Sequence, residues 1–440
     1  MLKNYFRIAY RNLVRNKFAG AINIGGLAIG MTVAILISLW ISDELSFDHG
    51  TPNHKQIAAV LKNEDFNGIQ TWWSMPWEVG PTLRKDYGSL FKHVVMDAGN
   101  QSHLFTYGDK KLKSIGDYAE PPIIDLLSLK MLRGSKTALD DESSVILSTT
   151  TARELFGEAD PMGKVITLDN AHPVKVTGIY ADLPRNSSFS YLQFVVPWRL
   201  LMASEHYETK LGWGNSWFQC YVQLNDHIDM AKASQAIALT QQRYDYKPKA
   251  SAPRFFLYPL DRWHLYSDFK DGVPVGGRIR FVRLYAVIGA FILLLACINF
   301  MNLATARSEK RAREVGIRKA IGSLRGQLIR QFFIESMLIA FISFVLAIGV
   351  AQLLLPFFSE VADKKMSIPL GQPLFWVAGL CFTAFTGLLA GSYPALYLSS
   401  FRPVSVLNNT LKSGSKASVF RRTLYTKTLS MHPDDGTSVP

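Results

Sequence analysis

Long apolar runs alternate with polar segments along the chain. Four runs stand out, at 19–41, 283–306, 332–358 and 374–398, and their only charged residues are Arg283, which opens the second run, and Glu335 in the third. A helix of about 20 residues crosses the roughly 30 Å hydrocarbon core of a bilayer. Helices in the core of a soluble protein are usually shorter and amphipathic. The pattern therefore predicts four transmembrane helices.

The first apolar run lies where a signal peptide would lie, but it lacks the length and the cleavage site of one. Its uncharged stretch exceeds the ~7–15 residues of a signal-peptide core. Ile-Ser-Asp-Glu-Leu closes this run where a small-x-small cleavage site would be needed. We therefore interpret the run as an uncleaved membrane anchor.

Charge is distributed unevenly along the chain. In total 48 Lys and Arg oppose 35 Asp and Glu, and the net charge of +13 alone suggests a polyanionic partner. The segments 1–18, 307–331 and 399–440 hold 19 basic and four acidic residues, which leaves 29 basic and 31 acidic residues elsewhere. An even number of spans places these segments on one side, and the positive-inside tendency makes that side the cytoplasm. Nucleic-acid binding thereby loses its main support.

The predicted topology is that of a multi-pass membrane protein with a cytoplasmic N-terminus. It begins with a cytoplasmic basic helix at 1–18 and has a large external domain at 42–282. A cytoplasmic segment at 307–331, an external loop at 359–373 and a cytoplasmic tail at 399–440 connect or follow the later spans. The expected fold class is thus a membrane protein of four α-helices, with an α/β extracytoplasmic domain inserted between the first two.

The N-terminal segment carries a periodic basic pattern. Lys3, Arg7, Arg11 and Arg15 recur at every fourth position, which places them along one side of a helix. Such an amphipathic helix binds membrane lipid with its basic face toward the phosphates. Charge that only sets the topology explains the same residues, and both interpretations stay open.

Small and polar residues inside the first two spans predict contacts between helices. Gly26 and Gly30 form a G-x-x-x-G pair, a spacing that lets two helix backbones approach closely, and we assign them to transmembrane packing. Small residues are common in membrane helices, so a dimerisation face is only one interpretation of this pair. Asn299 and Asn302 indicate interhelical hydrogen bonds rather than a transport pathway.

Within 42–282 the pattern indicates a mixed α/β domain. The β-rich run 144–148 ends at Ser148, which is suited to cap a helix at 149–156. Asp169-Asn170 reads as a turn between two strands. The further predicted strands are 165–168, 174–180, 194–197 and 218–224. Three tryptophans, at 72, 73 and 77, fit either a ligand surface or core packing, and core packing is favoured.

The cytoplasmic segment between the second and third spans combines charge pairs with apolar positions. Glu309 with Arg313, and Glu314 with Arg318, are favourable i,i+4 pairs on a helix. Such an amphipathic helix would provide a docking surface for a partner. A solvated charged loop explains the pattern equally well on physical grounds.

No catalytic chemistry is evident in the sequence. The string from Gly157 to Val165 has one residue too many for a P-loop and ends in Val where Ser or Thr must reach magnesium. H-E-x-x-H, G-x-S-x-G and C-x-x-C motifs do not occur, and the nine histidines show no metal-ligand spacing. We expect neither an enzyme nor a resident metal or cofactor, with ATP bound by a separate subunit where energy is needed.

Several strings resemble the bacterial ABC-transporter permeases of the MacB/FtsX/LolC type. They are YFRIAYRNLVRNKFAGAINIGGLAIG, SVILSTTTARELFGEADPMGKVITLDN, HPVKVTGIYADLPRNSSF, INFMNLATARSEKRAREVGIRKAIGSLRGQLIRQFFIES and AGSYPALYLSSFRPVSVL, of which REVGIRKAIG is the most specific. They span nearly the whole chain. The resemblance implies a MacB-like periplasmic core domain at 42–282, an FtsX-like membrane domain and a location in the bacterial inner membrane, with the external side, including the loop at 359–373, in the periplasm.

The same resemblance implies a partner and a mechanism. It assigns the segment around REVGIRKAIG to the contact with a cytosolic ABC ATPase, whose cycle is relayed mechanically to the periplasmic domain. The residues so assigned are Arg313, Glu314, Val315, Gly316, Ile317, Arg318, Lys319, Ala320 and Gly322. A second permease half or a homodimer, and a periplasmic adaptor, are further implied partners. The expected function is export or extraction of an envelope substrate, and the alternative is an FtsX-like signal relay that regulates an envelope enzyme.

One feature departs from the family pattern. Many such permeases are about twice this length and repeat the unit of core domain and membrane domain. Here the string VFRRTL is followed by YTKTLSMHPDDGTSVP, which is polar and cannot span a membrane. The chain is therefore expected to correspond to the first half of a longer design, as after a frameshift or truncation.

Overall fold

The computed structural model describes residues 11, 17–65, 67–207, 212–245, 252–306, 319 and 324–399. These residues form two compact units. One contains the described parts of Met1–Leu39 and Val287–Pro440, and the other is Trp40–Ala286. Each unit has its own hydrophobic core.

Four long apolar helices confirm the predicted spans. They are α2 (Lys17–Leu45), α11 (Ile279–Ala306), α13 (Arg325–Val361) and α14 (Pro373–Ser399). All four are long and apolar enough to cross a membrane. α13 begins seven residues before the predicted span, so the end of the predicted cytoplasmic segment is part of this helix. At 1.5 Å per residue α13 is about 55 Å long, well beyond one hydrocarbon thickness.

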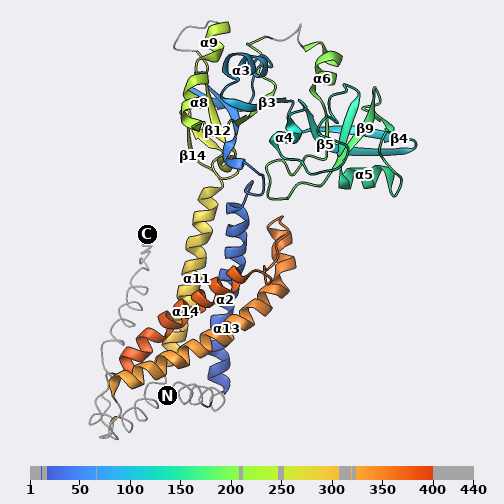
Figure 1. Ribbon diagram of the computed structural model, residues 1–440. Helices are drawn as coiled ribbons and strands as arrows, with labels where there is room; N and C mark the ends of the chain where they lie inside the picture. The colour runs from blue at the N-terminus through green and yellow to red at the C-terminus, as the bar shows by residue number, and fades with distance from the viewer. Residues whose placement is uncertain are drawn as a thin grey trace, which may run out of the picture. The chain divides into compact units, whose positions relative to one another are not determined.

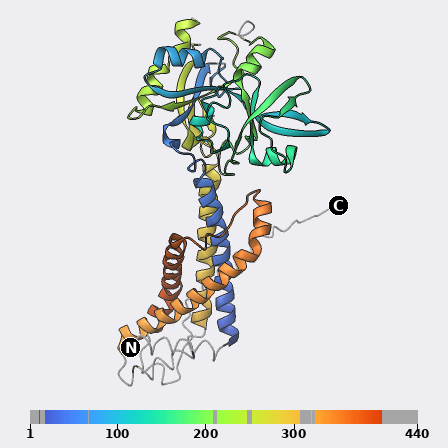
Figure 2. The same cartoon turned by 45° about the vertical axis from the view of Figure 1, so that its right-hand side comes forward.

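The four helices share one buried apolar cluster. α2 contributes Leu27 and Met31, and its neighbour α11 contributes Cys297; both views show these two helices side by side (Figures 1 and 2). α13 and α14 pack along each other through small residues, because a Cβ on Gly391 would lie 2.7 Å from Ser336 Oγ. Side-chain hydroxyls add bonds between helices, as Ser343 Oγ donates to the carbonyl of Ile24 at 3.2 Å. Close approach of this kind is how membrane helices gain packing energy.

The unit Trp40–Ala286 is built on a twelve-stranded sheet, whose right-hand part in Figure 1 carries β4, β5 and β9. The strands are β1 (Ile57–Asp65), β2 (Ile69–Trp72), β3 (Phe91–Asp97), β4 (Gln101–Tyr107), β5 (Lys110–Ala119), β6 (Met131–Arg133), β7 (Ser144–Ser148), β8 (Val165–Leu168), β9 (His172–Tyr180), β10 (Phe194–Pro197), β11 (Gln219–Leu224) and β12 (Arg254–Pro259). A separate hairpin pairs β13 (Asp268–Lys270) with β14 (Val273–Gly276).

The sheet has a closed part and an open part. Its order is β10-β7-β9-β8-β4-β5-β3-β11-β1-β12, and an additional parallel pairing of β10 with β5 closes the first six strands into a ring. The strands from β3 to β12 extend from that ring as an open antiparallel sheet. Short helices cover the sheet: η1 (His54–Gln56), α3 (Val79–Tyr87), α4 (Ile123–Leu126), α5 (Thr149–Phe156), α6 (Trp198–Glu205), α8 (Met230–Ile237), α9 (Thr240–Tyr244) and α10 (Leu260–Trp263).

Several predicted elements of this domain are confirmed. β7 and α5 have the predicted bounds, and Ser148 Oγ accepts a hydrogen bond from the backbone N–H of Thr151, which is the expected N-cap. The strands β8, β9, β10 and β11 lie where apolar runs predicted them, with β9 beginning two residues earlier. Asp169 and Asn170 have φ of 50° and 57°, and the N–H of Ala171 donates to the carbonyl of Leu168 at 3.0 Å, so the predicted turn joins β8 to β9.

Candidate functional site

The predicted coupling residues fall almost entirely outside the described residues. Of the nine, only Lys319 is described, and the other eight lie in the gaps at 307–318 and 320–323. The described chain resumes at Leu324, whose backbone N–H donates to Gln327 Oε1 at 3.2 Å at the start of α13. The C-terminal part of the predicted cytoplasmic segment is thus continuous with a 37-residue helix.

Gly26 and Gly30 both face α11 of the same chain. Gly30 is buried, and a Cβ built on it would lie 2.5 Å from Ala296 Cβ, closer than real Cβ contacts come. A Cβ on Gly26 would lie 3.3 Å from Asn299 Nδ2, so this amide is placed between the two helices. The G-x-x-x-G face therefore lets α2 and α11 approach within one chain.

A buried carboxylate lies at the end of α2. Glu44 is 0% exposed, and its Oε2 lies 2.6 Å from Nε2 of His264, just after α10. Its Oε1 lies 3.5 Å from Nη1 of Arg278, directly before α11. The ring of Phe47 stacks on that of His264 with centroids 3.5 Å apart. We call Glu44, Phe47, His264 and Arg278 the Glu44 cluster.

The Glu44 cluster explains how a carboxylate is kept where water is excluded. Burying an unpaired charge costs several kcal/mol, so a buried carboxylate needs partners of opposite charge or hydrogen-bond donors. Here the partners are His264, just after α10, and Arg278, just before α11. One side chain thus joins the end of α2 to the residues that precede α11, at a sequence separation of more than 200 residues.

A second buried acid fixes the segment that follows α2. Asp48 is 1% exposed, and both its oxygens accept hydrogen bonds of 2.6 Å from Ser188, one from the backbone N–H and one from the hydroxyl. Burial raises the pKa of Asp48, and these hydrogen bonds lower it in part. The N–H of Asp48 donates to the carbonyl of Asn186 at 2.7 Å. The chain leaving α2 is therefore held in one conformation.

Two family models match the chain. The MacB-like periplasmic core domain covers residues 21–239, and the FtsX-like permease C-terminal domain covers residues 286–403. The chain belongs to the MacB/FtsX-type family of ABC transporter permeases.

Two sequence relatives agree with this assignment. A macrolide export ATP-binding/permease protein MacB of Shigella boydii is 30% identical over 91% of this chain and 60% of its own length. An ABC transporter permease, YknZ of Bacillus subtilis, is 25% identical over 60% of each chain. The solved periplasmic region of MacB from Actinobacillus actinomycetemcomitans shares 16% identity, with a TM-score of 0.37, and covers 48% of this chain and 92% of its own. The chain spans about two fifths to three fifths of the length of the MacB relatives it matches.

The external domain of this permease contains a cleft of about 490 Å³. Its lining includes the aromatic side chains of Trp77 and Trp198 and the charged side chains of Arg84 and Glu120. Arg84 binds Glu120 with two parallel hydrogen bonds of 2.7 and 2.8 Å, and Glu120 also accepts the N–H of Met96. Of the three tryptophans predicted to favour core packing, Trp73 packs against one core and Trp77 against the other while lining the cleft, and Trp72 is 42% exposed.

Two carboxyl groups lie together in the interior of the domain. Asp97 on β3 is 0% exposed and Asp117 on β5 is 1% exposed, and Tyr191 Oη donates to Asp117 Oδ2 at 2.8 Å. Burial and the neighbouring carboxylate of Asp117 hold the pKa of Asp97 well above its usual range. Burial raises the pKa of Asp117 to about 6. Both carboxyl groups therefore keep a proton to higher pH than an exposed aspartate does.

Sequence reasoning missed most of these residues. Glu44 stands directly after an apolar run, which is a weak signal of a functional acid, and His264 and Asp117 carry no local signal at all. Histidine spacing predicts no metal site, yet the fold brings ligand atoms of His49, His54 and Asp261 within 4.8 Å of one another. Contacts between residues this far apart in sequence follow only from the folded chain.

Proposed function

We propose that this chain is a permease subunit that relays ATP hydrolysis by a cytosolic ABC ATPase to its external domain, for export or extraction of an envelope substrate. The observation that carries the proposal is the Glu44 cluster at the end of α2. It joins the two chain segments that link the external domain to the first two spans.

The geometry suits mechanical transmission. α2 is an uninterrupted helix of 29 residues, about 43 Å long, and Glu44 lies in its last turn. Trp40 and Tyr285 add a T-shaped ring contact, with centroids 4.9 Å apart, between α2 and α11. A shift of either helix would be passed to α10 and to the segment after α2, because a buried ion pair resists separation. Packed elements with discrete arrangements are what couple distant sites.

Charge supports the orientation of this relay. The basic excess of the segments at 1–18, 307–331 and 399–440 puts the N-terminus and the coupling segment in the cytoplasm, with the external domain in the periplasm. Residues 313–322 then face a cytosolic ATPase. α13 begins at Arg325, so a force on this segment acts on the end of a long helix.

The ATPase partner is inferred from sequence and relatives together. The sequence contains no P-loop, whereas MacB relatives are named ATP-binding/permease proteins and YknZ is named a permease. Such a partner supplies nucleotide binding. A second permease half or a homodimer, membrane lipid and a periplasmic adaptor complete the proposed assembly.

Mutation of the coupling segment tests the proposal. We expect the double variant Glu314→Ala, Arg318→Ala to lose co-purification with the ATPase and to lose stimulation of ATP hydrolysis. The matched control is Glu360→Ala, Lys365→Ala, which removes the same charges from the predicted periplasmic loop and is expected to behave as wild type. Unchanged ATPase binding and stimulation in the first variant would refute the coupling role.

Transport itself needs a separate assay. ATP-dependent movement of substrate in vesicles of the reconstituted complex supports the transporter. If no substrate moves while the complex still controls an envelope hydrolase, the result supports the alternative function, an FtsX-like signal relay, in place of transport.

A further inference from the structure

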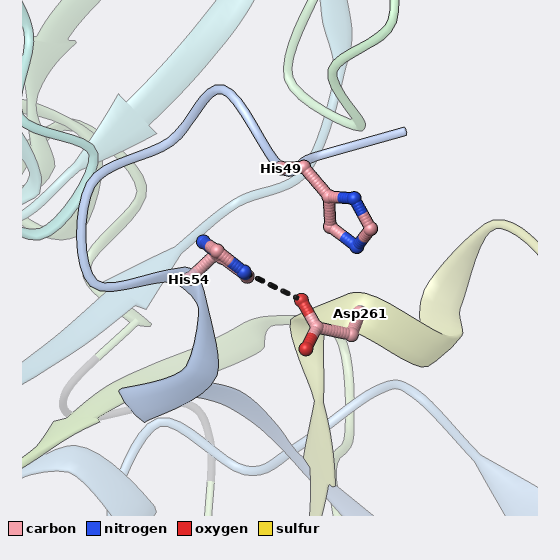
Figure 3. Close-up of side chains that lie close together, drawn as sticks. All are labelled: His49, His54 and Asp261. Carbon is pink, nitrogen blue, oxygen red and sulfur yellow. Dashed lines mark ion pairs between the residues drawn. The ribbon is translucent and has the colours of Figure 1, made fainter. Parts of the chain in front are cut away.

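Three side chains with metal-binding atoms meet beside the segment that follows α2 (Figure 3). His49 lies in the turn after α2, and His54 is the first residue of η1. Asp261 comes from α10, more than 200 residues further along the chain. One ligand atom from each lies within 4.8 Å of the others. Among the described residues, no other group of three His, Cys, Asp or Glu side chains meets this condition.

The orientation of His54 prepares it for a cation. Its Nδ1 lies 3.1 Å from the carbonyl oxygen of Thr51, and because a carbonyl only accepts, Nδ1 must carry the hydrogen. In the neutral ring Nε2 then presents its lone pair, and it lies 3.6 Å from Asp261 Oδ1. A backbone carbonyl bound to the far nitrogen is the usual support of a metal-binding imidazole.

The carboxylate on the other side lacks a hydrogen-bond donor. Asp261 Oδ1 is buried and accepts no hydrogen bond from the described part of the chain. Two acceptor atoms, His54 Nε2 and Asp261 Oδ1, thus face each other across 3.6 Å when the ring is neutral. Such a pair is satisfied by a cation between the two atoms, either a proton on the imidazole or a metal ion.

The third side chain, His49, favours a metal ion over a proton between His54 and Asp261. The rings of His49 and His54 have centroids 5.2 Å apart at 41°, so His49 supplies a second imidazole next to the facing pair. Ligand atoms of a tetrahedral zinc ion with bonds near 2.0–2.1 Å are about 3.4 Å apart. His49 is exposed, so its side chain has room to turn toward the facing pair.

The supporting backbone is already ordered. Asp48, the residue before His49, accepts two hydrogen bonds from Ser188. Asn53 precedes His54 with φ of 58°, a left-handed turn that asparagine tolerates. Two imidazoles and one carboxylate form a donor set of catalytic-type zinc sites, which leave a coordination position for water.

We propose that His49, His54 and Asp261 bind a divalent transition-metal ion of the zinc class. The ion links the segment directly after α2 to α10, next to the Glu44 cluster. It thereby ties together two segments of the external domain that are distant in sequence, and it stabilises the folded chain by mass action. The proposal does not depend on transport or on the ATPase.

The test is a zinc titration of the full chain in detergent, after chelator treatment and removal of the chelator. Calorimetry with Zn²⁺ alone should show one ion per chain, and Co²⁺ should give the absorption of a tetrahedral site. We expect His49→Gln, His54→Gln and Asp261→Asn each to weaken binding about tenfold or more. The control His103→Gln removes a histidine that pairs with Asp169 and is not part of the proposed site, and it should leave binding unchanged.

A measurement on the unmutated chain guards against variants that fail to fold. Diethyl pyrocarbonate labelling followed by mass spectrometry should show that Zn²⁺ protects His49 and His54, but not the exposed His227. Zinc should also raise the thermal unfolding midpoint of the wild type and not that of Asp261→Asn. Absence of zinc binding, equal binding by wild type and all three variants, or equal labelling with and without zinc would overturn the proposal.

Discussion

His264 Nε2 lies 2.6 Å from Glu44 Oε2, and this contact joins residues 220 positions apart in the sequence. Glu44 is fully buried, and His264 is stacked on Phe47, so the contact is shielded from water on two sides. Shielding strengthens an ion pair because the local dielectric is low. The contact therefore provides a stiff connection between α2 and the end of the external domain.

Loss of the Glu44 charge should destabilise the external domain. In Glu44→Gln, His264 and Arg278 keep their positions but lose a carboxylate, and hydrogen bonds to charged groups are worth about 1.5–3 kcal/mol. We expect a lower thermal unfolding midpoint of the purified protein in detergent. Arg280→Gln is the control, because its pair with Asp268 is largely exposed and contributes little. Equal midpoints for Glu44→Gln and wild type would contradict the role of the cluster.

Enlarging Gly30 should separate α2 from α11. Gly30→Leu adds a side chain where even a Cβ lies 2.5 Å from Ala296 Cβ, and overpacking of this kind costs about 1–3 kcal/mol. Gly25→Leu is the control on the same helix, since a Cβ there meets nothing within 4 Å. We expect reduced thermal stability in detergent only for Gly30→Leu. The pair Gly30→Ala with Ala296→Gly should restore stability that Gly30→Ala alone loses.

The buried acid pair makes stability depend on pH. Asp97 and Asp117 have pKa values raised above the 3.8 of a free aspartate, so the folded chain holds protons that the unfolded chain releases. The stability contributed by the pair is therefore present at low pH and falls as pH rises above about 4, through the pKa of Asp117 at about 6 and then through the raised pKa of Asp97. We expect a loss of roughly 1–3 kcal/mol over this window.

The variant Asp97→Asn tests that pH dependence. An amide keeps a hydrogen-bond donor beside Asp117 without the charge, so the variant should be more stable than wild type at pH 8. Its unfolding midpoint should vary less between pH 4.5 and pH 8, as measured by thermal denaturation at fixed ionic strength. An unchanged pH profile would show that the pair does not control stability.

The lining of the cleft depends on Glu120. Glu120→Ala leaves the N–H of Met96 without its acceptor and Arg84 without its two hydrogen bonds, which costs about 1–3 kcal/mol for a poorly solvated donor. We expect a lower unfolding midpoint. Asp160→Ala, which breaks the exposed pair with Arg133, is the comparison and should leave the midpoint unchanged. Equal shifts of the unfolding midpoint in both variants would show that the Glu120 interactions stabilise the domain no more than an exposed ion pair does.

The four spans and the strands from β7 to β11 follow from local patterns. An apolar run long enough to cross the hydrocarbon core predicts a transmembrane helix. Ser148 marks the start of α5 directly, because serine is a preferred N-cap residue. β1 was not predicted, because Ala58 and Val60 face one core while Ile57, Ala59 and Leu61 face the other. A strand buried on both faces lacks the alternation that identifies strands.

The functional relationships were harder to predict than the elements. Gly26 and Gly30 were identified by spacing, but only the structure shows that α11 of the same chain is opposite them. Glu44 with His264, and His49 with Asp261, are each assembled from the two ends of one domain. No local pattern encodes such a pairing, because the two ends of the domain meet only after the chain has formed the sheet between them.

Hydrogen exchange of the complex with its ATPase tests the central claim most directly. Amide exchange is compared with and without ATP in the segment 46–65 and in α10, for wild type and Glu44→Gln. The relay predicts an ATP-dependent change in both segments of the wild type, and its loss in Glu44→Gln while Arg280→Gln retains it. An ATP-dependent change that persists unaltered in Glu44→Gln, or no change in the wild-type complex, would contradict transmission through the Glu44 cluster.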